Sequence, residues 1–128
     1  MSIEFNHTIV LVRDRWEASR DVASVLGLDE PTAFGPFAVV ELANGVSLDF
    51  MEGEPSGQHY AFLVSEPEFD EVLGRLQESG RRWWADPYGT RPGEVNHDDG
   101  GRGLYWKGPD GYWLEIITRP YGSGGQAP

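Results

Sequence analysis

Two histidines and two acidic residues occupy matching places in the two halves of the sequence. His7 begins HTIVLVRD and His59 begins HYAFLVSE, so both stretches read H-x-x-x-L-V-x-acid. Further along, Asp49 lies in NGVSLDF and Glu115 lies in DGYWLEI, and both stretches read turn residue, Gly, two residues, Leu, acid, apolar residue. Imidazoles and carboxylates together are typical ligands of a divalent metal ion. A pseudo-twofold repeat would bring these side chains together, so the pattern predicts a metal site.

Glu115 is the member of this set that most needs a partner. In a strand it shares its face with Trp113 and Ile117, and an unpaired carboxylate on an apolar face is costly. The two histidines also share their strand faces with apolar residues. A cation bound by His7, His59 and Glu115 would supply the missing partner and leave positions open for water or substrate oxygens.

Asp49 admits more than one interpretation. Its strand face holds Ser47 and Met51, so the ordinary alternation of a half-buried strand already explains a polar residue there. It could also bind the ion directly or through a water molecule.

Each half contains a predicted helix between its paired motifs. In the second half SEPE, residues 65–68, is a capping box, and apolar residues follow at helical spacing until Gly80: Phe69, Val72, Leu73 and Leu76. In the first half Asp14 is the predicted cap, and Gly27 ends the helix.

A strand is expected to begin at each of the two histidines, and a short one near residues 31–34. The other expected strands are PFAVVELA, VSLDFME, RRWWAD, RGLYWKG and WLEII. Each half then reads β-α-β-β-β. The sequence therefore predicts an α+β protein of one domain, residues 1–128, with βαβββ modules at about 5–52 and 58–120 and a flexible tail at 121–128. Two such sheets most simply face each other.

Composition limits the classes of partner. The formal charge of −11 works against nucleic acid or an anionic membrane, and it favours a small molecule. The chain has no cysteine, which excludes disulfides, thiolate metal sites and cysteine nucleophiles. No basic segment precedes a long apolar run, so we expect a soluble, cytoplasmic protein.

The long loop at residues 85–103 contains NHDDGG and could carry further function. His97 is a candidate general acid or base, or part of a second metal site, and the alternative is an ordinary polar turn. Arg102 could bind a substrate carboxylate in a bidentate way, and the alternative is a salt bridge to one of the loop acids.

Aromatic residues are concentrated in the second half. Most of them should belong to the core, but Trp113 shares a face with Glu115 and therefore lies beside the predicted metal. The candidate substrate-binding residues are Trp84, Tyr105, Trp106 and Trp113. An aromatic wall of this kind suits a planar or bulky ligand.

His7, His59 at the start of HYAFLV, the GPDG turn and Glu115 in WLEII together resemble the vicinal oxygen chelate superfamily, from about Phe5 to Tyr121. This superfamily includes glyoxalase I, extradiol dioxygenases, fosfomycin-resistance transferases and bleomycin-resistance proteins. The resemblance implies paired βαβββ modules, curved mixed sheets around a cleft that holds a metal, and a homodimer. It places His7, His59 and Glu115 at ligand positions. Asp49 falls where glyoxalase I has a fourth ligand, a Glu, and this departure speaks against a lactoylglutathione lyase.

The ligand set is compatible with one divalent ion, Fe, Mn, Zn, Ni or Co, that stabilises an enolate or alkoxide. Isomerisation, epimerisation, ring cleavage with O₂ and addition to an epoxide all remain open. We expect a metal-dependent enzyme that acts on a small oxygenated substrate, aromatic or otherwise apolar. The alternatives are a protein that sequesters an antibiotic or metabolite without catalysis, and a structural protein with a vestigial site.

Overall fold

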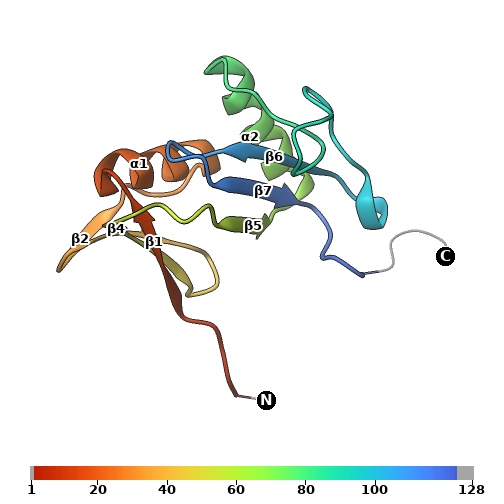
Figure 1. Ribbon diagram of the computed structural model, residues 1–128. Helices are drawn as coiled ribbons and strands as arrows, with labels where there is room; N and C mark the ends of the chain where they lie inside the picture. Colours follow the sequence, from red (N-terminus) through yellow and green to blue (C-terminus); the bar gives the residue numbers. More distant parts are fainter. Residues whose placement is uncertain (1, 124–128) are drawn as a thin grey trace. The chain divides into compact units, whose positions relative to one another are not determined.

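The computed structural model describes residues 2–123 and divides the chain into two compact units (Figure 1). The first unit contains the described residues up to Gln58 together with Gly108–Tyr112. The second contains His59–Lys107 and the described residues from Trp113 onward. Among the described residues, no helix has the length and apolar character needed to cross a membrane.

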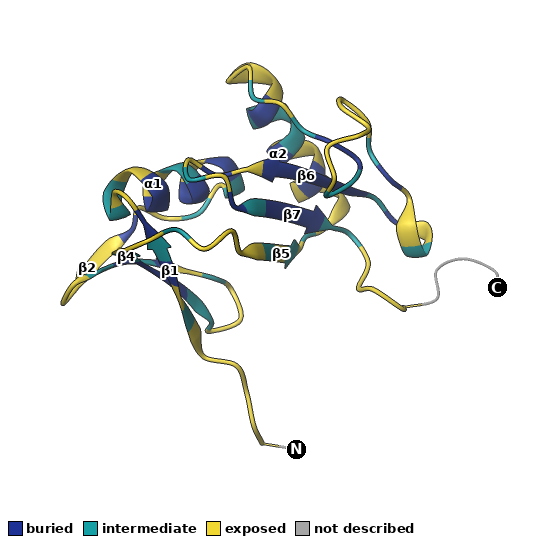
Figure 2. Cartoon of the chain, in the orientation of Figure 1, coloured by how far each residue is buried: buried dark blue, intermediate teal, exposed yellow. Residues whose placement is uncertain are grey.

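The first unit consists of a four-stranded mixed sheet and one helix. Its elements are β1 (His7–Val12), α1 (Arg15–Leu26), β2 (Thr32–Phe34), β3 (Phe37–Glu41) and β4 (Ser47–Glu52). The strand order is β1-β4-β3-β2, with β1 parallel to β4 and the other pairs antiparallel. The helix packs on β1, β3 and β4. Figure 2 shows β2 exposed along its length, which agrees with the short and weakly marked strand expected there.

The second unit contains a three-stranded mixed sheet. Its elements are β5 (His59–Leu63), α2 (Glu66–Glu78), the 3₁₀ turn η1 (Asp98–Gly100), β6 (Gly103–Lys107) and β7 (Trp113–Ile117). The strand order is β5-β7-β6, with β5 parallel to β7 and β6 antiparallel to it. Two mixed sheets with few helices confirm the predicted α+β class.

The helix ends follow the sequence signals. The Asp14 carboxylate accepts hydrogen bonds from the N–H groups of Trp16 and Glu17, both at 3.0 Å, and Gly27 ends α1 with φ +72°. Ser65 and Glu68 form the predicted reciprocal capping box at the start of α2. The predicted apolar stripe of α2 buries Phe69, Val72 and Leu76. These signals are local, which is why sequence alone located both helices.

The strand expected in RRWWAD is absent as a regular element. Only Trp84 forms bridges there, one to Tyr105 through two backbone hydrogen bonds of 2.9 and 2.8 Å and one to Pro92. The chain turns immediately afterwards, because Ala85 N–H donates to the Arg91 carbonyl and the Asp86 carboxylate accepts from Thr90 and Arg91. The turn chemistry of Asp86 therefore stops the ladder after one residue pair.

The residues of the sequence repeat occupy equivalent register positions in the two sheets. His7 pairs with Ser47 and His59 pairs with Trp113, while Asp49 and Glu115 lie two positions further along β4 and β7. Because side chains alternate between faces, each histidine shares a sheet face with the acid of its own unit. The opposite faces carry buried core residues: Val10, Val12, Leu48 and Phe50 in the first unit, and Leu114 and Ile116 in the second.

Two glycines should respond in opposite ways to alanine. A Cβ at Gly108 would lie 2.3 Å from Cζ of the buried Tyr112 ring, whereas a Cβ at Gly74 in α2 meets nothing within 4 Å. Gly108→Ala should therefore lower the free energy of unfolding by about 1 to 3 kcal/mol through overpacking. Gly74→Ala should raise it by up to about 1 kcal/mol through helix propensity. Urea denaturation measures both, and equal effects would contradict the described packing of the 108–112 turn.

Candidate metal centre

The Glu115 carboxylate in β7 is almost completely buried, with 1% of its side chain exposed. Its two oxygens have different partners. Nε2 of His59 lies 2.9 Å from Oε1, and the Tyr121 hydroxyl donates to Oε2. Burial of a charged group is costly unless such partners exist. The apolar strand around Glu115 therefore tolerates a carboxylate because His59 and Tyr121 face it.

The His59 and Glu115 pair fits a divalent ion in chemistry and in spacing. Imidazole nitrogen and carboxylate oxygen bind such ions at about 2.1 Å, so two ligands at a right angle lie about 3 Å apart. The observed 2.9 Å between Nε2 and Oε1 agrees with this separation. His59 is 42% exposed, so the pair is accessible from solvent. An ion bound by these two atoms would replace the contact between them.

Two tyrosines extend the hydrogen-bond chain from Glu115. The Tyr105 hydroxyl lies 3.0 Å from the Tyr121 hydroxyl, and since the single Tyr121 proton is donated to Glu115, Tyr105 donates to Tyr121. Burial and the hydrogen bond to Glu115 raise the pKa of Tyr121 to about 12. Burial, followed by the bond to Tyr121 and the charge of Glu115, raises the pKa of Tyr105 well above its usual value. Both hydroxyls thus stay protonated at neutral pH and orient the Glu115 carboxylate.

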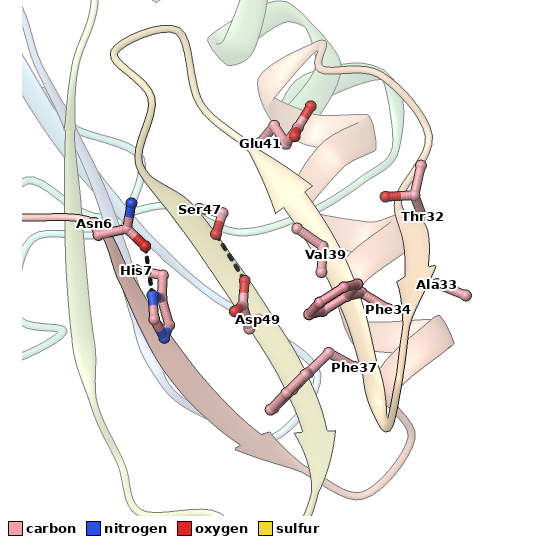
Figure 3. A pocket seen from close by; sticks show the side chains of 10 residues that line it. All are labelled: Asn6, His7, Thr32, Ala33, Phe34, Phe37, Val39, Glu41, Ser47 and Asp49. Carbon is pink, nitrogen blue, oxygen red and sulfur yellow. Dashed lines mark hydrogen bonds between the residues drawn. The ribbon is translucent and has the colours of Figure 1, made fainter.

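In the first unit, His7 and Asp49 line one pocket of about 410 Å³, on neighbouring strands of the sheet (Figure 3). His7 Nδ1 donates to the Asn6 side chain at 2.7 Å, and the Ser47 hydroxyl donates to Asp49 at 2.7 Å. Asp49 is 9% exposed. The remaining lining residues form a mainly apolar side with one further acid: Thr32, Ala33, Phe34, Phe37, Val39 and Glu41.

The predicted ligands thus occur as two pairs, one in each unit. His59 and Glu115 are in direct contact within the second unit, and His7 and Asp49 line the same pocket of the first unit. In residues 2–123 no group of three or more His, Cys, Asp or Glu side chains is assembled for a metal ion. The NHDDGG stretch accordingly forms no second metal cluster within this range.

The two candidates in the long loop have local partners. His97 is exposed, and its Nδ1 donates to the Gly101 carbonyl at 3.2 Å. Arg102 forms salt bridges with Glu66 at 2.8 Å and Asp70 at 2.9 Å, both on α2, and its guanidinium stacks over Phe69. Both salt bridges would have to break before Arg102 could bind a substrate carboxylate.

The predicted substrate-binding aromatics lie on two different faces. Trp84 and Tyr105 meet the ring of Trp113 edge-on, with centroids 5.3 and 6.2 Å apart, and His59 meets Tyr105 at 5.6 Å. Trp106 follows Tyr105 in β6 and therefore points to the opposite face, where it is fully buried at 0% exposure. Trp106 is a core residue, and the aromatic group beside Glu115 consists of Trp84, Tyr105 and Trp113.

Tyr121 is the site residue that sequence reasoning missed. It lies in the segment expected to be a flexible tail, six positions after Glu115, and no strand or helix pattern marks it. A tyrosine that contacts an acid through the tertiary fold leaves no periodic signal in the sequence. Residues 124–128 of the predicted tail lie outside the described part of the chain.

Comparison with solved structures decides the family. Oxidase ChaP-H1 is 56% identical, with a TM-score of 0.93 over 95% of this chain and 100% of that one. Oxidase ChaP-H2 is 54% identical, with a TM-score of 0.93 over 97% and 99%. A glyoxalase/bleomycin resistance protein from Catenulispora acidiphila is 25% identical, with a TM-score of 0.65 over 91% and 100%. The chain belongs to the vicinal oxygen chelate superfamily.

Membership in the vicinal oxygen chelate superfamily confirms the resemblance that His7, His59, the GPDG turn and Glu115 indicated. No family model matches the chain, and no curated protein sequence matches it. The two oxidases align over nearly their whole length, so the superfamily relationship covers both units of this chain.

The hydrogen bond from Tyr121 to Glu115 can be tested by removing one hydroxyl. Tyr121→Phe leaves one oxygen of a buried carboxylate without its donor, and it should lower the free energy of unfolding by about 1 to 2 kcal/mol at pH 7. Tyr88→Phe is the control, because Tyr88 is 85% exposed, and it should change stability by less than about 0.5 kcal/mol. Urea titration followed by circular dichroism gives both values. Equal stability of the two variants would contradict the described role of Tyr121.

Proposed function

We propose that this protein is a metal-dependent oxidase that acts on a small oxygenated substrate, aromatic or otherwise apolar. The observation that carries the proposal is the contact between His59 and the buried Glu115, which supplies two adjacent metal ligands. The names of the two relatives with 56% and 54% identity, both oxidases, support the reaction class.

His59 and Glu115 would hold the ion through Nε2 and Oε1, and His7 is the third ligand that the proposed set requires. Support for His7 comes from the sequence repeat and from its matching register position on β1. Two histidines and one carboxylate form a set that suits divalent iron, and a bound divalent ion supplies Lewis-acid and oxygen chemistry. Asp49 shares the pocket of His7 and is the fourth candidate ligand of the proposed set.

The remaining residues fix the geometry of this centre. Tyr121, held by Tyr105, keeps Oε2 of Glu115 occupied and leaves Oε1 to face His59. Trp113 covers the same face of the sheet and limits the access of water to Glu115. A preorganised and partly dry site of this kind increases the effect of every charge within it.

A non-catalytic binding protein is the second candidate function, and the aromatic group of Trp84, Tyr105 and Trp113 favours it. Ligand binding in the absence of metal distinguishes this candidate from an oxidase. A drug-like aromatic ligand that binds tightly after removal of the metal, with no product formed, would identify a sequestering protein.

Metal content tests the proposed ligands. Protein purified without added metal should contain about one divalent ion per chain by elemental analysis, and His59→Ala, Glu115→Gln and His7→Ala should each lose most of it, because each removes a ligand. His97→Ala is the control and should keep the ion, since His97 donates only to the Gly101 carbonyl in the second unit. An unmodified protein without a stoichiometric ion would rule out the proposed oxidase.

The homodimer implied by the superfamily remains a prediction. Size-exclusion chromatography with light scattering should give about twice the chain mass of 14.3 kDa. A single-chain mass over the whole concentration range would contradict it.

A further inference from the structure

Lys107 lies on the same sheet face as His59 and Glu115. It pairs with Trp113 across β6 and β7, and Trp113 pairs with His59 across β7 and β5. The three residues therefore form one row across the sheet. Neighbouring strands are about 4.8 Å apart, so the Lys107 backbone lies about 10 Å from that of His59. The side chains of Lys107 and His59 thus lie on either side of Trp113 on one sheet face.

Two cations flank the indole pair next to this row. The Lys107 ammonium lies 5.0 Å from the centroid of the Trp113 ring and 5.9 Å from that of Trp84. The Arg82 guanidinium lies 5.0 Å from the Trp84 centroid. Both cations are exposed, and the two indoles meet edge-on. Lys107 is the only lysine in the chain.

These two cations differ from most others in their lack of acidic partners. The chain has 21 acids and only 10 basic residues, and at least six of the arginines form ion pairs: Arg13, Arg15, Arg20, Arg75, Arg91 and Arg102. Within residues 2–123, neither Lys107 nor Arg82 has a carboxylate oxygen within 4.0 Å. Lys107 and Arg82 thus contact one indole pair and leave their positive charges without a carboxylate at contact distance.

Stacking on tryptophan does not by itself explain this lack of acids. Arg20 also stacks on an indole, 5.2 Å from the Trp16 centroid, yet it has Glu30 at 3.6 Å. A cation–π contact and an acidic partner are therefore compatible in this protein. The positive charges of Lys107 and Arg82 remain available to an anion from outside the chain.

We propose that Lys107 and Arg82, with Trp84 and Trp113, form an anion subsite that selects aromatic ligands carrying a carboxylate or phenolate. The ammonium and guanidinium groups bind the anionic oxygen, and the half-buried Trp113 contacts the ring while the buried Trp84 supports it from below. This inference rests on the proposed function in one respect, since it assumes that the other end of the ligand reaches His59 and Glu115. The inference extends the proposed function in two ways: the substrate is an anion, and Lys107 and Arg82 recognise its charge.

The test compares 2-naphthoate with 2-naphthamide, a neutral molecule of nearly the same shape. Isothermal titration calorimetry on the full chain, as purified and again with EDTA, should show tighter binding of naphthoate in both conditions. Binding should weaken as NaCl rises from about 0.05 to 0.5 M, because salt screens exposed charges.

Three variants localise the effect. Lys107→Met should weaken naphthoate binding about fivefold, the upper range for one exposed ion pair, and leave naphthamide binding unchanged. Lys107→Met combined with Arg82→Met should weaken it about twentyfold if the two effects add. Arg20→Met is the matched control, because it removes an equal charge from another indole, and it should leave the naphthoate affinity unchanged. The Lys107 side chain is exposed, so circular dichroism should show an intact fold.

Three results would overturn the subsite: no preference of the unmodified protein for naphthoate, equal loss of both ligands in Lys107→Met, or the same loss in Arg20→Met. A preference for naphthoate that persists in EDTA shows that the subsite does not depend on a bound ion. Protein that contains no stoichiometric ion as purified, yet prefers naphthoate, would exclude the oxidase and support the subsite. A metal-containing protein with no such preference would do the reverse.

Discussion

A buried carboxylate imposes the main constraint on the second unit. Glu115 lies in an apolar strand with 1% of its side chain exposed, and the fold must supply polar partners for both of its oxygens. His59 comes from the adjacent parallel strand, and Tyr121 comes from the segment that follows β7. Each partner fixes one oxygen. The orientation of the candidate metal ligand is therefore set before any ion binds, and this preorganisation links stability to function in this protein.

The two units meet the same requirement in different ways. Asp49 occupies the register position of Glu115, but its carboxylate accepts from Ser47 on its own strand and lines an open pocket. The shorter acid needs no histidine contact to be satisfied. The acid of the second unit thus faces an imidazole, while the acid of the first unit faces a pocket.

Sequence alone predicted the parts that depend on local chemistry or on repetition. The capping box at Ser65, the cap at Asp14 and the paired positions of His59 and Glu115 all follow from short-range pattern or from comparing the two halves. The missing strand in RRWWAD has a different origin, because a side-chain turn at Asp86 overrides the β-propensity of the two tryptophans. Tyr121 contacts Glu115, and Lys107 contacts Trp84 and Trp113. These contacts follow no period in the sequence.

The isolated bridge at Trp84 has a consequence for the long loop. A second bridge joins Asn96 to Gly103, and the Asn96 amide donates to the Ala85 carbonyl at 2.8 Å. The two ends of the segment between Ala85 and Asn96 are thus tied to each other as well as to β6. A segment closed at its base in this way can change length or sequence while the strands stay in register. Within the segment, the bridge from Trp84 to Pro92 leaves the short turn from Asp86 to Arg91 as the part with the fewest ties to the sheet that holds Glu115.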